Sequence, residues 1–323
     1  MDDVVLRTPV CDVLGIRYPV LQAGMAVAGN GRLAAAVAEA GGLGTIGSIP
    51  GGVARDQQME AVRRETRLAR SLTDGVISVN IPMAYGLGDE LLEIAIEEGA
   101  QAVSVTAGSP TRLAPRAHQH GLQVLGVVGS LAQAHKALDS GVDVLVVEGT
   151  EAGGLNHPDC LSILALLPKI ANEVSLPLVA AGGFADGRGL AAALMLGAHA
   201  VQMGTRFLAS EECHIHDNSK QAIVDAGPDG TFLLWEGRHY PSRALSTPYT
   251  KRLLEQERAD IPREQRVRSA DAQMDGNLEA GMLTVGMSSY LIEDIRPAGE
   301  IVRAVVQEAV QMLGTAAAYT RST

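Results

Sequence analysis

LPLVAAGGFADGRGLAAALMLGAHAVQMGTRFL, residues 176–208, contains two short apolar runs, and each run ends in a glycine turn. Asp186 can cap a helix between them, over residues 187–196, that is too apolar all round to be a free surface helix. A strand–helix–strand unit of this length makes its two strands parallel, so both turns lie at the carboxyl end of one sheet. Two neighbouring turns of backbone N–H groups predict an anion site there, and phosphate is the anion that fits best.

Eight short apolar runs alternate with seven helical patterns along the first two thirds of the chain. The predicted strands cover residues 18–23, 43–46, 76–81, 100–105, 123–128, 143–147, 176–181 and 200–203. Such alternation is typical of parallel βαβ units, and eight of them close a barrel. We therefore predict an α/β fold, a (β/α)8 TIM barrel, in preference to an open doubly wound sheet. Phosphate commonly binds after strands seven and eight of such barrels, where the quoted stretch falls.

The barrel pattern stops after Glu211. Residues 213–277 contain four prolines, a charged helical stretch at 250–260 and the only tryptophan, Trp235. We interpret them as a smaller, mostly helical insertion, or cap, after strand eight. Apolar periodicity returns at residues 278–295 and 297–313, and we expect the last helix to return to the barrel wall. The predicted domains are a barrel of residues 1–212 and 278–323, and an insertion of residues 213–277.

Composition restricts the partners and the location of the protein. The net charge of −11 argues against nucleic acid, which needs a basic surface. No apolar run reaches the roughly 18 residues of a membrane span, and the N-terminus has no secretion-signal pattern. Three cysteines without close spacing favour reduced thiols in a cytoplasmic protein. The string His214, His216 and Asp217 has no third ligand cluster, so we predict no metal site. The C-terminal helices can pack on the barrel or pair two subunits, which leaves a homodimer open.

Five segments in order carry a family resemblance: LQAGM (21–25), AGGLGTIGS (40–48), EGTEAGG (148–154), AAGGFADGRG (180–189) and MGTRFLASEE (203–212). With them the chain resembles the nitronate monooxygenase, or 2-nitropropane dioxygenase, family of FMN-dependent TIM-barrel enzymes. That family has relatives that act as enoyl-acyl-carrier-protein reductases and NAD(P)H:quinone reductases. The resemblance extends over most of the chain and is weaker between residues 215 and 275.

The resemblance implies FMN as cofactor. Its phosphate would be held by the amides of Gly182, Gly183, Gly204 and Thr205 and by the Thr205 hydroxyl, in agreement with the anion site inferred above. Arg206 would either pair with this phosphate or form a salt bridge at the barrel rim. The other implied FMN-binding residues are Gln22, Ala23, Gly24, Met25, Asn80, Glu151, Gly153, Gly154, Ala181, Gln202 and Met203. Without the resemblance, Asn80 could be an ordinary turn former and Gln22 a strand-end residue.

Leu155 departs from the family pattern. Many relatives have a histidine directly after EAGG that serves as a base, and leucine cannot accept a proton. His157 is the replacement candidate for a catalytic residue, provided that the loop brings it to the site. We expect Leu155 and Met25 to line the pocket of a small-molecule substrate.

Three functions are compatible with this pattern. Nitronates arrive already deprotonated, so their oxidation with O2 to a carbonyl compound and nitrite does not need the missing base. We therefore expect an FMN-dependent oxidoreductase with nitronate monooxygenase-like activity. The alternative is an NAD(P)H-dependent reductase of quinones or enoyl thioesters, for which Leu155 would make the pocket more apolar. The third is a barrel that binds FMN or another phosphorylated ligand without turnover.

Overall fold

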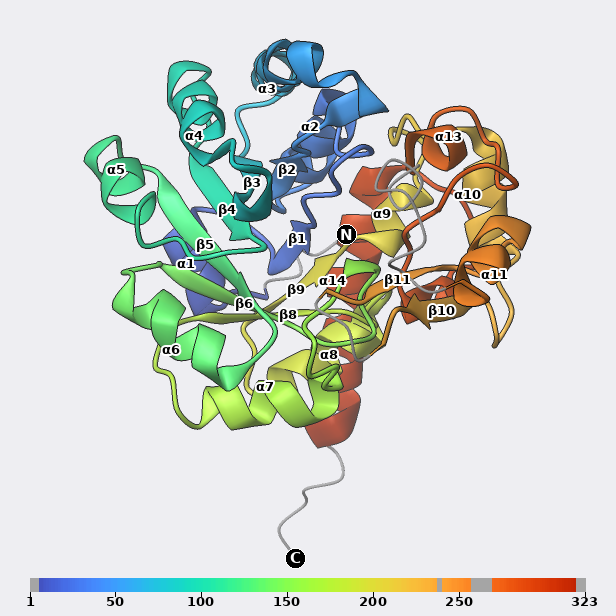
Figure 1. Cartoon of the computed structure of the whole chain (residues 1–323). Helices are drawn as coiled ribbons and strands as arrows, with labels where there is room; N and C mark the ends of the chain where they lie inside the picture. Colours follow the sequence, from blue (N-terminus) through green and yellow to red (C-terminus); the bar gives the residue numbers. More distant parts are fainter. Residues whose placement is uncertain (1–5, 237–239, 257–268, 318–323) are drawn as a thin grey trace, which may run out of the picture.

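The computed structural model describes residues 6–236, 240–256 and 269–317 (Figure 1). Eight parallel strands form one sheet in the order β1-β9-β8-β6-β5-β4-β3-β2, and a parallel bridge between Leu21 and Leu43 joins β1 to β2. The sheet is therefore closed, and the predicted TIM barrel is confirmed. Its strands are β1 (Val20–Gln22), β2 (Gly44–Ile46), β3 (Ile77–Pro82), β4 (Ala102–Thr106), β5 (Gln123–Val128), β6 (Val144–Glu148), β8 (Leu178–Ala181) and β9 (Ala200–Met203).

Helices surround the strands as the sequence pattern predicts. They are α2 (Gly31–Glu39), α3 (Gln58–Leu72), α4 (Gly88–Glu97), α5 (Ala114–Gln119), α6 (Leu131–Asp139), α7 (Ile163–Ala171) and α8 (Gly187–Met195). Asp186 caps α8 as expected, because its carboxylate accepts the Gly189 N–H at 2.8 Å. The last helix, α14 (Ala298–Ala317), packs against α8 and α2 and so returns to the barrel wall as predicted.

The hydrophobic core of the barrel has two layers, and a third, smaller cluster lies in the insertion. The larger layer lies between the strands and the surrounding helices. The smaller one fills the barrel interior, where α1 (Pro9–Leu14) packs Val10, Cys11 and Leu14 against inward-facing strand residues such as Leu21 and Leu125. These apolar side chains fill the amino end of the barrel, so the carboxyl ends of the strands are left for a site.

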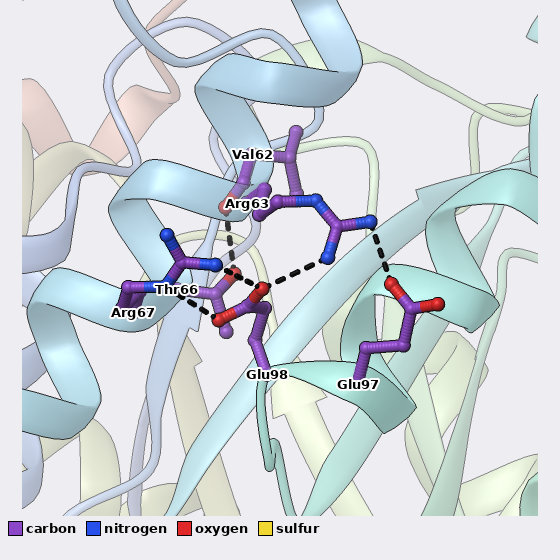
Figure 2. A network of polar contacts seen from close by, with 6 residues as sticks. All are labelled: Val62, Arg63, Thr66, Arg67, Glu97 and Glu98. Atoms are coloured by element: carbon purple, nitrogen blue, oxygen red, sulfur yellow. Dashed lines mark hydrogen bonds and ion pairs between the residues drawn. The ribbon is translucent and has the colours of Figure 1, made fainter.

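An ion-pair network joins α3 to the end of α4 in the outer layer (Figure 2). Arg63 contacts Glu97 at 2.6 Å and Glu98 at 2.9 Å. Arg67 donates two hydrogen bonds to Glu98, at 2.7 and 2.9 Å. Hydrogen bonding, chiefly from Arg67, holds the pKa of Glu98 below its usual range even though partial burial acts in the opposite direction.

The segment after the barrel strands gathers beside the barrel, at right in Figure 1. Its described elements are α9 (Thr205–Leu208), α10 (Asp217–Val224), β10 (Thr231–Leu234), β11 (Ser242–Leu245), α11 (Pro248–Leu254), α13 (Ser269–Gln273) and the 3₁₀ helix η5 (Met287–Leu291). Helix α11 overlaps the first part of the charged helical stretch expected at 250–260, of which residues 257–260 lie outside the described part. The domain boundaries at 213 and 277 stay a prediction.

The insertion also contains a hairpin that the sequence pattern did not indicate. Strands β10 and β11 are antiparallel, and β11 pairs in turn with β7 (Gly154–Leu155), the loop after β6. Arg243 of β11 strengthens this join because its Nε donates to the Thr150 carbonyl at 2.8 Å. The insertion is thereby attached to the EAGG loop. In the described ranges, no helix is both long and apolar enough to cross a membrane.

Candidate active site

A cavity of about 770 Å³ opens at the carboxyl ends of the barrel strands. Trp235 and Met282, from the later part of the chain, form part of its wall. The volume lies within the roughly 300–1,000 Å³ of small-molecule and cofactor pockets. The predicted site residues that line it are Ala23, Gly24, Met25, Asn80, Gly153, Gly154, Leu155, His157, Ala181, Gly182, Gly183, Gln202, Gly204 and Thr205.

The two glycine turns supply donors to this cavity. Gly182 and Gly183 have φ values of 92° and 86°, a left-handed conformation that favours glycine. The amides of Gly182, Gly183, Gly204 and Thr205 donate to no acceptor within the part of the chain that the structure describes. The Thr205 hydroxyl accepts the Gly286 N–H at 2.9 Å, so its own proton is left to donate to a ligand. These residues fit a phosphate group.

Asn80 is held at the cavity wall by its neighbours. A Cβ atom on Gly24 would come within 2.4 Å of the Asn80 side chain, so only glycine leaves room for the amide. Thr106 donates to Asn80 Oδ1 at 3.3 Å, which leaves the amide nitrogen for a polar atom of a ligand.

Gln22, Glu151 and Met203, by contrast, do not line the cavity. The Gln22 amide donates to the Thr45 carbonyl at 2.7 Å and accepts the Thr45 N–H at 3.2 Å, which joins β1 to β2. The Met203 side chain is 1% exposed and belongs to the layer between strands and helices. Their assignment to FMN stays a prediction that these contacts do not support.

The Glu151 carboxylate binds the start of α7 and not the cavity. Its carboxylate accepts the Ser162 hydroxyl at 2.6 Å and the Ile163 N–H at 3.0 Å, at the first turn of α7. A carboxylate at this end interacts favourably with the helix dipole. Glu151 therefore fixes the EAGG loop to α7.

The contacts of Arg206 distinguish its two predicted roles, a partner of the phosphate or a salt bridge at the barrel rim. Its Nη1 is 3.0 Å from Asp294 Oδ1, and its Nη2 donates to the carbonyls of Ala209 and Asp294 at 2.7 and 2.6 Å. Arg206 therefore forms the rim salt bridge and does not line the cavity.

The loop after β6 presents Leu155 and His157 to the cavity. Leu155 is 43% exposed, and its backbone is fixed by the pairing with Ser242. His157 Nδ1 accepts the Asp159 N–H at 3.2 Å, which places the ring proton on Nε2 in the neutral form. A base role for His157 stays a prediction.

Glu148 is the functional candidate that the sequence pattern indicated least. It is the last residue of β6 and lines the cavity, and its carboxyl group makes no hydrogen bond or ion pair with the described residues. Burial raises the pKa of Glu148 to about 7. A carboxyl group that changes protonation near neutral pH in a ligand cavity is a candidate acid or base. Its signals in the sequence were its position directly after a predicted strand and its place at the start of the family segment EGTEAGG.

Within the string His214, His216 and Asp217, the Nε2 atom of His214 is buried without a hydrogen-bond partner among the described residues. His216 caps α10 by accepting the Asn218 N–H at 3.1 Å, and burial lowers the pKa of His214. No three His, Cys, Asp or Glu side chains gather as metal ligands among the residues whose placement is described.

A model of the nitronate monooxygenase family matches residues 7–308. The chain belongs to this family. It is 30% identical to the (3aS,4S,5R,7aS)-5-hydroxy-7a-methyl-1-oxo-octahydro-1H-indene-4-carboxyl-CoA dehydrogenase of Mycobacterium tuberculosis, over 97% of this chain and 99% of that protein. It is 28% identical to a probable nitronate monooxygenase of Staphylococcus saprophyticus, over 95% of this chain and 99% of that protein.

Two solved structures are similar to this chain over nearly its whole length. The structure of FabK from Thermotoga maritima is 36% identical in sequence to this chain and superimposes with a TM-score of 0.91. The match covers 98% of this chain and 100% of FabK. Nitroalkane oxidase from Streptomyces ansochromogenes is 25% identical with a TM-score of 0.81, covering 95% and 99% of the two chains. The resemblance inferred from the sequence is confirmed, and the protein is an oxidoreductase of the FMN type.

The residues of the cavity can be compared with FMN, the cofactor that the family resemblance implies. The donors at Gly182, Gly183, Gly204 and Thr205 fit the FMN phosphate, and the Asn80 amide fits a polar atom of the ring. Bound FMN would supply the hydride chemistry. The chain itself supplies orientation, an apolar wall at Leu155 and a titratable carboxyl at Glu148.

Proposed function

We propose that the protein is an FMN-dependent oxidoreductase that uses NAD(P)H to reduce an enoyl thioester. The observation that carries this proposal is Glu148, a cavity carboxyl whose pKa is raised to about 7. Reduction of a carbon–carbon double bond beside a thioester adds a hydride to one carbon and a proton to the other. A carboxyl that is still protonated near neutral pH can donate that proton.

The comparisons support the same substrate class. The family resemblance includes enoyl thioester reductases, and the Mycobacterium relative is named as a dehydrogenase of a CoA thioester. Leu155 adds an apolar surface at the mouth of the cavity, which suits an acyl chain. In this reading Asn80 and the glycine turns orient the cofactor, while Glu148 delivers the proton.

The test is an anaerobic spectrum of the FMN-loaded protein with NADPH or NADH, followed by crotonyl-CoA. We expect the nucleotide to bleach the flavin absorbance and the enoyl thioester to restore it, with butyryl-CoA as the product seen by mass spectrometry. Failure of every pyridine nucleotide to bleach the flavin would exclude the reductase.

Oxidation of alkyl nitronates is the second candidate, and Leu155 favours it. The position of the family histidine carries no base, and a nitronate does not need one because it is already deprotonated. The same preparation is supplied with propyl-2-nitronate in air. Nitrite release with nitronate, together with no bleaching by NADPH, would replace the reductase by the monooxygenase.

A further inference from the structure

A second cavity, of about 580 Å³, lies between α6 and α7. These two helices are neighbours on the outside of the barrel (Figure 1). Gln133, Lys136 and His157 line both this cavity and the active-site cavity. A ligand that occupies the second cavity can therefore extend into the first.

The second cavity combines an apolar floor with positive charge. Leu131, Leu161 and Leu166 supply apolar surface, and Lys136 and Lys169 lie at its edge. Asp159 also lines the cavity, and Lys169 pairs with Glu173, so the positive charge available to a ligand comes from Lys136. An elongated ligand with a flat apolar part and an anionic part matches these walls.

Lys136 is the cation that remains for a ligand. Lys169 Nζ lies 2.5 Å from Glu173, and the acidic Asp159 lies 3.4 Å from His157 Nδ1. The Lys136 ammonium has no ion pair or hydrogen bond with the residues in the described ranges, and it is exposed at the junction of the two cavities. A lysine binds phosphate as a point charge without needing fixed geometry.

We propose that the cavity between α6 and α7 binds the adenine-nucleotide tail of an extended cosubstrate. The adenine ring lies on the leucine floor, and a phosphate lies at Lys136. Coenzyme A and the nicotinamide dinucleotides both carry such a tail. In both, the reactive end lies at a distance from the adenine, which suits a second cavity that joins the first. The identity of the cosubstrate rests on the proposed function. The presence of a site for the adenine-nucleotide tail between α6 and α7 does not.

Binding of ADP to the FMN-loaded protein, measured by calorimetry, tests the site without turnover. Lys136→Ala is expected to weaken ADP binding about tenfold, the effect of losing about 1.4 kcal/mol of charge-assisted contact. Lys251→Ala is the matched control, because Lys251 is an exposed lysine of α11 that lines neither cavity, and it should bind ADP as the unchanged protein does. Ala165→Phe fills the exposed floor of the cavity and should also weaken ADP binding. Undetectable ADP binding, or equal affinity in all these proteins, would overturn the proposal.

Steady-state kinetics then identify the source of the tail. If it belongs to the thioester, Lys136→Ala raises KM about tenfold more for crotonyl-CoA than for the N-acetylcysteamine thioester, which has no nucleotide. If it belongs to the reductant, the KM for NADPH rises instead. Equal increases for the two thioesters with no change for NADPH would overturn the proposal. ADP binding that depends on Lys136, in a protein that reduces no thioester, would leave the site standing and remove the proposed function.

Discussion

Glu98 and Glu148 are the same side chain in two environments, and the fold gives them opposite properties. Both are partly buried. Glu98, in the outer helix layer, meets Arg63 and Arg67, and its pKa lies below the usual range (Figure 2). Glu148, in the cavity, meets no cation among the described residues, and its pKa is raised to about 7. The comparison shows that burial without a partner cation makes a carboxyl a candidate proton carrier, whereas two arginine partners make it a member of an ion-pair network.

The largest effect is expected from Glu148→Gln on turnover. Glutamine keeps the shape and loses the titratable proton, so the rate of enoyl thioester reduction should fall about 10²–10⁴-fold. The unchanged enzyme should lose activity as the pH rises through about 7, because Glu148 must be protonated to donate, whereas the variant should show no such inflection. Steady-state rates from about pH 5 to about pH 9, with FMN content measured in parallel, check this.

Glu98→Gln is the control for that experiment. It changes the same residue type outside the cavity and should leave the pH profile of the rate unchanged. A Glu148→Gln enzyme within a few-fold of the original rate at every pH would remove Glu148 from the proton transfer and weaken the proposed function.

The second-largest effect is expected on the free energy of unfolding, because the raised pKa of Glu148 makes stability depend on pH. Because the folded pKa of Glu148 is raised from 4.5 to about 7, the folded state keeps a proton that the unfolded state releases, and stability falls as pH rises through this window. Glu148→Gln should therefore be more stable than the original at about pH 8, by at most about 3 kcal/mol, and gain nothing from this source below about pH 4. Urea unfolding of the flavin-free proteins at the two pH values measures the difference. An equal difference at both would show that the carboxyl is not desolvated.

Leu155→His adds a titratable group to a cavity that already contains Glu148 and His157, and it tests whether the missing family histidine limits base chemistry. If Leu155 is the reason that base chemistry is absent from this loop, the variant should gain activity on neutral nitroalkanes, by at least about tenfold. Nitrite release from nitroethane, compared with that from ethyl nitronate, measures the gain. No gain would mean that the missing histidine does not explain the substrate range.

The sequence was sufficient to predict features that depend on the local pattern of residues along the chain. The alternation of apolar runs predicted all eight barrel strands, and Gly182 and Gly204 marked two turns that do meet at one cavity. Side-chain direction was harder to predict, because it depends on strand register. Gln22 lies beside the cavity residue Ala23, yet its amide pairs with the backbone of β2.

Long-range pairing and enclosure could not be predicted from the sequence. The two residues of β7 have no strand signal of their own, and they become a strand only because β11, almost ninety residues later, lies beside them. The raised pKa of Glu148 also depends on burial, and the cavity that Glu148 lines is built from residues as far apart in the chain as Ala23 and Ser288. The sequence therefore shows Glu148 as an acidic residue directly after a predicted strand, and it does not show the burial of its carboxyl group.

The smallest effect is expected on the free energy of unfolding when Glu98, the ion-paired glutamate, is replaced. Its folded pKa is lowered, so its ionised form contributes stability above its unfolded pKa, and this contribution is lost as pH falls through the folded pKa. Glu98→Gln should therefore destabilise the protein near neutral pH by less than about 1 kcal/mol, since pairs at a protein surface contribute little. The difference should shrink in acid and in high salt, which is opposite in pH dependence to Glu148→Gln. If the two variants shifted stability with pH in the same direction, arginine contacts would not be what separates these two glutamates.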